Sequence, residues 1–206
     1  MSFEGYGEDM EPGKRDIMEA THRAVREHGY SDLTIQHIAD EFGRSKALLY
    51  YHYDGRDDLL VDFLDYILGG FLANLPEGGT APREELDALV DRLLPTTVDE
   101  EPHRLMLAMF ELRMNAPHDD AVREQYVEVE AQLRDILEDI LRRGIEANDF
   151  VDVDVDAEAE ALLSLLVGTR ARRLTVYEPD TSIEPLKRAI DAHVARISTA
   201  DADSDD

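Results

Sequence analysis

Apolar residues recur every three or four positions along most of the chain, the spacing that places them on one face of an α-helix. In residues 14–28, for example, Ile17, Ala20 and Ala24 share a face, and Gly29 ends the helix. The same spacing predicts further helices over about residues 35–42, 46–53, 59–71, 82–94, 102–115, 119–146, 156–176 and 183–198. No segment has the sustained alternation of a β-strand, so the predicted fold class is all-α.

Two short predicted helices lie between residues 34 and 53. Thr34 is expected to cap the first of them, and Gly43 supplies a turn residue that tolerates unusual backbone angles. The second helix opens on small and polar residues that can approach the edges of bases: Ser45, Lys46, Ala47 and Leu48. This arrangement is typical of a helix-turn-helix, whose second helix lies in the major groove of DNA. The spacing alone fits a structural helical hairpin equally well.

The charge of the chain is strongly acidic and unevenly distributed. Among 206 residues, 47 are Asp or Glu and 21 are Lys or Arg, which gives a formal net charge of -26. A protein whose whole surface is a basic nucleic-acid patch is therefore excluded. Residues 14–60, however, hold seven basic and nine acidic side chains, whereas residues 61–206 carry a net charge of -20. A nearly neutral N-terminal quarter is thus joined to a strongly acidic remainder.

The composition also indicates where the protein works. Only three of the 21 basic residues are Lys, and an acidic, lysine-poor surface holds water and hydrated cations in concentrated salt. We interpret this composition as salt (halophilic) adaptation; an ordinary acidic protein is the alternative. No run approaches the roughly 18 apolar residues that span a bilayer, and the N-terminus lacks the apolar segment of a secretory signal. We therefore expect a soluble, cytoplasmic protein with no membrane partner.

A family resemblance is visible in residues 14–60. The N-terminal DNA-binding domain of the TetR family of transcriptional regulators resembles the segment KRDIMEATHRAVREHGYSDLTIQHIADEFGRSKALLYYHYDGRDDLL. The matching features, in order, are a second helix led by Thr34, a turn at Gly43, a recognition helix that starts at Ser45-Lys46, and its tyrosine-led end. That end, LYYHY, more often finishes in Phe in the family than in the Tyr53 found here.

The resemblance implies a DNA-contacting role for ten residues. Thr34 and the helix it begins would contact phosphate, Lys46 would read guanine acceptors, and Leu48 would contact a thymine methyl group. The full set is Thr34, Gln36, Ser45, Lys46, Ala47, Leu48, Tyr50, Tyr51, His52 and Arg56. Arg44 and Ala47 depart from the residues usual in the family, so the operator sequence cannot be taken from a relative.

Three of these residues have alternative roles within the fold. Tyr50 would pack in the core with Ile38, His52 would cap a local carbonyl group, and Arg56 would pair with Asp57 or Asp58.

The rest of the chain resembles, more loosely, the ligand-binding and dimerisation domain of the family. Asp156 is a natural N-cap for the helix at 156–176, and this helix and the one at 183–198 are expected to form a four-helix dimer interface. The apolar contacts predicted there are Leu162, Leu163, Leu166, Val167, Ile190, Val194 and Ile197. The alternative is that these side chains form the core of a single chain.

A ligand pocket is expected between the helices at 102–115, 119–146 and 156–176. Methionine side chains adapt to ligands of varied shape, and four apolar residues with Arg113 beside them form a stripe on the first helix. The predicted lining is Met106, Met109, Phe110, Arg113, Met114, Tyr126 and Arg170. Such a stripe is more often part of a hydrophobic core.

These features predict a DNA-binding domain at 14–60 and a ligand-binding and dimerisation domain at 61–198, between an acidic flexible N-terminus at 1–13 and a disordered acidic tail at 199–206. The expected function is that of a homodimeric, sequence-specific DNA-binding repressor, released from a palindromic operator by a small-molecule ligand. No Cys, catalytic motif, phosphate loop or metal-ligand spacing is present, so we expect no enzyme activity, cofactor or metal. The alternative is a helical ligand-binding or adaptor protein that does not bind DNA.

Overall fold

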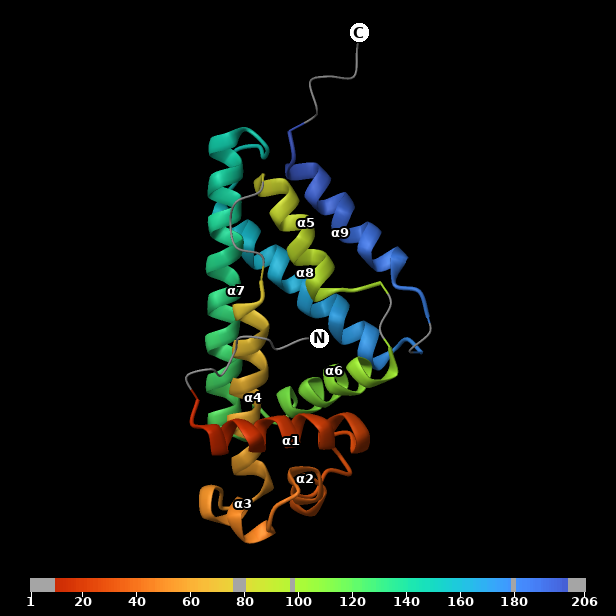
Figure 1. Ribbon diagram of the computed structural model, residues 1–206. Coiled ribbons are helices and arrows are strands. Elements are labelled where there is room, and N and C mark those ends of the chain that lie inside the picture. The colour runs from red at the N-terminus through yellow and green to blue at the C-terminus, as the bar shows by residue number, and fades with distance from the viewer. Residues whose placement is uncertain (1–9, 76–80, 97–98, 179–180, 200–206) are drawn as a thin grey trace. The chain divides into compact units, whose positions relative to one another are not determined.

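The computed structural model describes residues 10–75, 81–96, 99–178 and 181–199, and it confirms the all-α fold class. These residues form nine helices and no strand beyond an isolated bridge between Phe150 and Ser198. The helices, labelled in Figure 1, are α1 (Pro12–His28), α2 (Ile35–Phe42), α3 (Lys46–His52), α4 (Arg56–Ala73), α5 (Pro82–Leu93), α6 (Glu100–Arg113), α7 (Asp120–Ala147), α8 (Val155–Thr175) and α9 (Glu184–Ile197). The flexibility predicted for the two termini falls largely on residues 1–9 and 200–206, which lie outside the described ranges.

The helices group into two compact units. Unit 1 comprises Met1–Asn74 and Val98–Val129, and it contains α1 to α4, α6 and the first part of α7. Unit 2 comprises Leu75–Thr97 and Glu130–Asp206, and it contains α5, the rest of α7, α8 and α9. These two packing units do not coincide with the predicted DNA-binding and ligand-binding domains, which meet at residue 60. That functional boundary stays a prediction.

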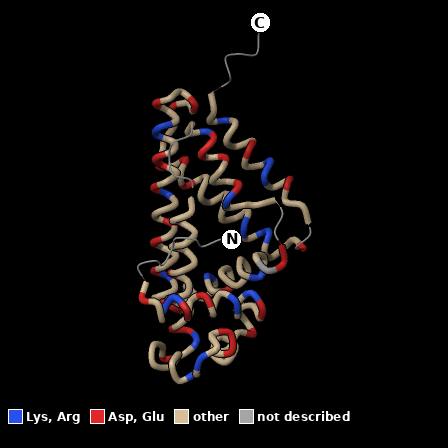
Figure 2. Tube along the Cα trace, in the orientation of Figure 1, with Lys and Arg blue, Asp and Glu red and all other residues tan. Residues whose placement is uncertain are grey.

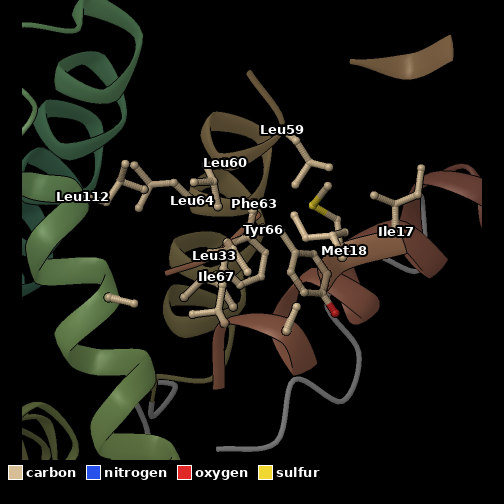
Figure 3. Close-up of a cluster of buried hydrophobic side chains, with 14 of the residues drawn as sticks. Ile17, Met18, Leu33, Leu59, Leu60, Phe63, Leu64, Tyr66, Ile67 and Leu112 are labelled. Carbon is tan, nitrogen blue, oxygen red and sulfur yellow. The ribbon is translucent and has the colours of Figure 1, made fainter. Parts of the chain in front are cut away.

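Unit 1 is built around one apolar core (Figure 3). Met18 of α1, Phe63 of α4 and Leu112 of α6 are all at most 4% exposed, and Leu33 from the α1–α2 loop adds a fourth element. Burying a side chain of this size stabilises a fold by roughly 1.5–3 kcal/mol. Because Leu112 belongs to this core, α6 packs with the N-terminal helices although it begins only at Glu100, well after the predicted DNA-binding domain ends at residue 60.

The boundaries of α1, α2 and α3 follow local rules that the sequence already indicated. The hydroxyl of Thr34 accepts a hydrogen bond from the backbone N–H of His37 at 3.2 Å and so caps α2. Gly43 ends α2 at φ 65°, in the left-handed region that glycine adopts without steric cost. Ser45 occupies the N-cap position of α3 without a capping hydrogen bond from its side chain. The turn between α2 and α3 therefore has the predicted length and position.

The start of α8 differs from the prediction. The helix begins at Val155, and its N-cap is Asp154, whose side chain accepts from the backbone N–H of Ala157 at 3.2 Å. Asp156, which the sequence suggested as the cap, lies in the first turn, where its charge still favours the positive end of the helix. Two aspartates two residues apart both suit a cap, and in the structure the first of them makes the capping hydrogen bond.

Unit 2 has its own core, formed by α5, α7, α8 and α9. Leu86, Leu141 and Leu162 are completely buried in it. An ion pair accompanies these leucines: Glu85 is 6% exposed and accepts a hydrogen bond from Arg143 at 2.8 Å. A buried carboxylate is tolerated when it is paired and hydrogen-bonded in this way.

The connection from α7 to α8 closes tightly on Gly144. The backbone N–H groups of Asp149 and Phe150 donate to the Gly144 carbonyl oxygen at 2.8 and 3.1 Å. A Cβ atom at position 144 would lie 2.0 Å from the Phe150 ring, so only glycine fits there. The N–H of Val151 donates to the carbonyl of Ile197 at 2.8 Å, which fastens the end of α9 to this connection.

Candidate nucleic-acid interface

α2 and the turn that follows it are fastened to α1. Arg23 of α1 donates to the Glu41 carboxylate at 3.1 Å and to the Glu41 carbonyl oxygen at 3.0 Å. Arg44, in the turn, donates to Asp16 of α1 at 3.1 Å. Ile38 packs α2 against the apolar core of unit 1, in which it is fully buried. These contacts present α3 on a fixed support, which a helix that reads DNA requires.

α3 buries one residue and exposes the next two. Leu49 is fully buried, whereas the exposed fraction is 51% for Tyr50 and 81% for Tyr51. The inward position beside Ile38, considered for Tyr50, is thus occupied by Leu49. Two adjacent large side chains that project outward are unusual on a folded domain, and exposed apolar surface of this kind often marks a binding surface.

The first turn of α3 is accessible to base edges. Ser45 and Ala47 are exposed, and Leu48 is half-buried. The Lys46 ammonium group lies 5.7 Å from the centre of the Tyr50 ring, a cation–π contact. No carboxylate lies within ion-pair distance of Lys46 in the part of the chain that the structure describes. Lys46 therefore keeps its charge and its three donors for an acceptor outside the protein.

Three further residues predicted to contact DNA are all exposed: Thr34, Gln36 and His52. The Thr34 hydroxyl accepts from the N–H of His37 and can still donate its own proton to a phosphate oxygen. The side chain of Gln36 donates to Asp40 at 2.7 Å, which holds it along α2. The rings of His52 and Tyr51 are perpendicular, with their centres 5.1 Å apart. Both side chains can therefore reach the same stretch of the DNA backbone.

Arg56, predicted to clamp phosphate, makes three contacts inside unit 1. It donates to the Leu33 carbonyl oxygen at 3.1 Å, and its guanidinium group lies 4.7 Å from the centre of the Tyr30 ring. Its Nε atom is 3.6 Å from a carboxylate oxygen of Asp57, which is the partner that the sequence left open between Asp57 and Asp58. These contacts hold the α1–α2 loop, so a phosphate contact would come in addition to a structural role.

Tyr53 links α3 to two other helices, and nothing in the sequence pattern indicated this link. Its hydroxyl donates to Asp62 of α4 at 3.0 Å, and Lys14 of α1 pairs with the same carboxylate oxygen at 2.6 Å. Burial, followed by the negative charge of Asp62, raises the pKa of Tyr53, so the hydroxyl stays protonated and donates. Burial and the charge of Asp62 also raise the pKa of Asp65 on α4. The hydroxyl that Phe would lack thus joins α1, α3 and α4.

The positive charges near α3 are largely neutralised within unit 1. Lys14, Arg23, Arg44 and Arg56 each have a carboxylate partner, and acidic and basic residues are interspersed along the helices (Figure 2). Non-specific attraction to DNA grows with the number of phosphates that free cations neutralise. We therefore expect specific contacts from α3 to contribute most of the affinity.

Two family profiles match the chain. The profile described as "Bacterial regulatory proteins, tetR family" matches residues 17–63. The profile described as "BetI-type transcriptional repressor, C-terminal" matches residues 82–199, which is more than half of the chain. The chain belongs to the TetR family. It is accordingly a DNA-binding transcriptional regulator, which confirms the function implied by the sequence resemblance.

Individual relatives agree with this assignment. The crystal structure of a TetR transcription regulator from Haloarcula marismortui ATCC 43049 superposes with a TM-score of 0.80 at 34% identity, covering 91% of this chain and 98% of that one. The HTH-type transcriptional repressor AcnR of Corynebacterium diphtheriae is 23% identical over 147 residues, 69% of this chain and 72% of AcnR. The HTH-type transcriptional regulator BetI of Brucella anthropi is 33% identical over 85 residues, but the match covers only 39% of this chain and 44% of BetI.

In this TetR family protein the residues predicted to line the ligand pocket belong to both units. Arg170 lies on α8 in unit 2, and the others lie in unit 1: Met106, Met109, Phe110, Arg113, Met114 and Tyr126. The Tyr126 hydroxyl donates to the Met109 carbonyl oxygen at 2.5 Å, and the Arg113 guanidinium lies 5.0 Å from the centre of the Tyr126 ring. Met109 is 6% exposed and belongs to the core of unit 1, whereas Met114 is 55% exposed.

The residues predicted to form the dimer interface mostly face the interior of unit 2. Six of the seven are at most 6% exposed in the single chain, and Val167 is half-buried. The outward faces of the same two helices carry small exposed residues instead: Ala157, Ser164 and Gly168 of α8, and Ala189 and Ala192 of α9. A Cβ atom at Gly168 would meet nothing within 4 Å.

No group of three or more His, Cys, Asp or Glu residues comes together over residues 10–75, 81–96, 99–178 and 181–199. Among the helices in these ranges, none has the length and apolar character needed to cross a bilayer.

Proposed function

We propose that this TetR family protein is a repressor that binds a palindromic operator as a homodimer and leaves it when a small-molecule ligand binds. The exposure pattern of α3 carries the proposal: Leu49 is buried, Tyr50 and Tyr51 project outward, and Lys46 has no acidic partner in the described part of the chain. In the dimer, two copies of α3 would lie in successive major grooves. Lys46 would read a base, and the two tyrosines would donate to phosphates.

The dimer would be held by the outward faces of α8 and α9. Small side chains at Ser164, Gly168 and Ala189 would let the helices of two copies approach closely around a two-fold axis. The buried leucines of α8 would support this face from within and would not cross it. Val167 is the one originally predicted contact that is still partly accessible.

The ligand would act by favouring a conformation in which the separation of the two helix-turn-helix units no longer matches that of the two operator half-sites. A ligand shifts such an equilibrium only by its difference in affinity for the two conformations. The match of residues 82–199 to the C-terminal profile of a repressor supports a regulatory role for this part of the chain.

The protein would act in the cytoplasm, without catalytic activity, metal or cofactor, and in concentrated salt. With a charge of -20 on residues 61–206, repulsion from phosphates is strong in dilute salt and is screened as salt rises. We therefore expect the affinity for DNA to fall less steeply with KCl than it does for a basic repressor.

A gel-shift assay in KCl with the DNA upstream of the protein's own gene tests this proposal. Wild type should retard that DNA in preference to a scrambled sequence, and Lys46→Ala should lose the preference. Lys187→Ala is the matched control, because Lys187 pairs with Asp91 in unit 2 and lies outside α3. If wild type retards neither DNA, the chain is better described as a helical ligand-binding or adaptor protein. Equal retardation of both DNAs would contradict sequence-specific binding to this site.

A further inference from the structure

Two arginines of unit 2 lie in opposite electrostatic surroundings, and one of them, Arg173, is buried. Arg143 donates to Glu85 and to Asp139, both at 2.8 Å, and these hydrogen bonds raise its pKa. Arg173, in the last turn of α8, is only 4% exposed and donates to the carbonyl oxygen of Pro95. Within the described residues no carboxylate lies at ion-pair distance from Arg173. Burial alone lowers its pKa, with no contribution from a neighbouring charge.

A buried guanidinium group without a counter-ion is unfavourable. Removing a charge from water is costly unless an opposite charge or a full set of hydrogen bonds replaces the water. The carbonyl oxygen of Pro95 accepts a hydrogen bond from one of the three guanidinium nitrogens, which together carry five N–H donors. The described residues therefore supply Arg173 with one carbonyl acceptor and no carboxylate.

A second guanidinium group lies near the same end of α5. Arg92 belongs to the last turn of that helix, and its Nε atom is buried without a hydrogen-bond partner. Pro95, which accepts from Arg173, follows two residues after the helix ends. The C-terminal end of α5 thus carries one guanidinium of its own and receives another from α8.

The residues that adjoin these groups in the chain are apolar. Leu94 is fully buried, and Leu93 and Leu174 are each 8% exposed. A guanidinium group binds a carboxylate through two parallel hydrogen bonds, and the pair is strong where water is excluded. We propose that Arg173 is the anion-binding residue of a ligand site in unit 2, and that its ligand is a carboxylate with an apolar body. The proposal assigns a chemical class to the small-molecule ligand of the proposed function. The regulatory role of that ligand rests on the proposed function.

A structural role for Arg173 makes a different prediction. If Arg173 served only to cap the carbonyl groups at the end of α5, its removal would destabilise the protein. If it is kept for a ligand, its removal should leave the ligand-free protein as stable or more stable, because a hydrophobic side chain of similar volume often replaces a buried ion without loss. The stability of Arg173→Met without ligand separates the two roles.

The experiment compares the melting temperatures of wild type, Arg173→Met and Arg172→Met at constant KCl concentration. Arg172 is the matched control, because it neighbours Arg173 on α8 but is exposed and contacts Tyr177. The probes are octanoate, octanol and octyltrimethylammonium, with acetate and inorganic phosphate as anions that lack the apolar body. We expect octanoate alone to raise the melting temperature of wild type and Arg172→Met appreciably. Its affinity should fall about tenfold or more in Arg173→Met.

Three results would overturn the proposal. One is a ligand-free melting temperature of Arg173→Met that is lowered as far as by a core substitution. Another is octanoate binding that is equal in wild type and Arg173→Met, and the third is a wild type that octanoate does not stabilise. Binding of phosphate in place of octanoate would contradict the carboxylate assignment. None of these measurements involves DNA, so a failed gel shift would count against the proposed function and leave the anion site intact.

Discussion

The recognition helix α3 and the helix α8 differ in how clearly their sequences reveal which face points outward. In α3, seven residues long, Leu49 is buried and its tyrosine neighbours are exposed. In α8, Leu162 and Leu166 were expected at a dimer interface but lie inside unit 2. A short helix on a small domain has one face that can be buried, whereas a long helix that is apolar on several sides does not show which side faces its own chain.

The sharpest test of this difference uses α8. Leu166→Asp places a charge at a position that is 3% exposed, so it should destabilise unit 2 by several kcal/mol and not simply yield a folded monomer. Ser164→Arg, on the exposed face, should leave the helical content intact and shift the dimer towards monomer. Circular dichroism and light scattering at micromolar concentration measure both. If the Leu166→Asp protein is folded and monomeric, Leu166 is a dimer contact after all.

The corresponding pair in α3 is Leu49 and Tyr51. Leu49→Ala removes a fully buried side chain and should lower the free energy of unfolding by about 2–5 kcal/mol. Tyr51→Ala should change stability by less than about 0.5 kcal/mol, because the side chain is 81% exposed. It should instead weaken operator binding, as measured by fluorescence anisotropy. A Tyr51→Ala protein that melts early and binds normally would assign Tyr51 to the fold.

Lys46 sharpens the comparison within α3. Lys46→Ala should reduce affinity for the cognate operator by roughly 1–3 kcal/mol and relax discrimination at one base pair in each half-site. Binding titrations against a set of single-base operator variants would show this. Equal weakening on cognate and scrambled DNA would indicate that Lys46 contacts phosphate.

Arg56 should behave differently, because its guanidinium group already contacts Leu33, Tyr30 and Asp57. Arg56→Ala should lower stability by about 1 kcal/mol through the lost hydrogen bond. It should also weaken binding to cognate and scrambled DNA alike. Thermal melts and binding to both DNAs, measured as a function of KCl, test this prediction. An effect confined to the cognate operator would reverse the roles of Lys46 and Arg56.

The smallest expected effect concerns pH and unit 1. Burial, and then the nearby Arg26, lower the pKa of His22 from 6.5 to about 4. Between these values the unfolded chain binds more protons than the folded one, so stability falls as pH decreases from about 6.5 towards 4. His22→Gln should remove a contribution on the order of 1 kcal/mol from this decline. Melting temperatures of both proteins, measured from pH 6.5 to 4, test this prediction. If wild type and His22→Gln lose stability equally over this range, His22 does not contribute to the decline.

The features that sequence predicted best are the local ones. Thr34 caps α2 and Gly43 ends it through interactions within a few residues, which the residue types indicate directly. The packing of Leu112 against the N-terminal helices, the link from Tyr53 to Lys14, and the contact of Arg173 with Pro95 join residues far apart in the chain. No periodicity encodes such pairings, because they depend on how whole helices pack. For that reason the boundaries of α2 and α3 were predicted more completely than the packing between distant helices.

The glycine beneath Phe150 has a consequence for how the sequence can vary. At position 144 every alternative amino acid would collide with the aromatic ring, so nearly all amino-acid substitutions there should be removed by selection. Gly168 meets no neighbouring atom, so this single chain does not require a glycine there. In a library of random variants, depletion at position 144 would report on the fold of one chain. Depletion at position 168 would instead reveal a demand that arises only when two chains meet.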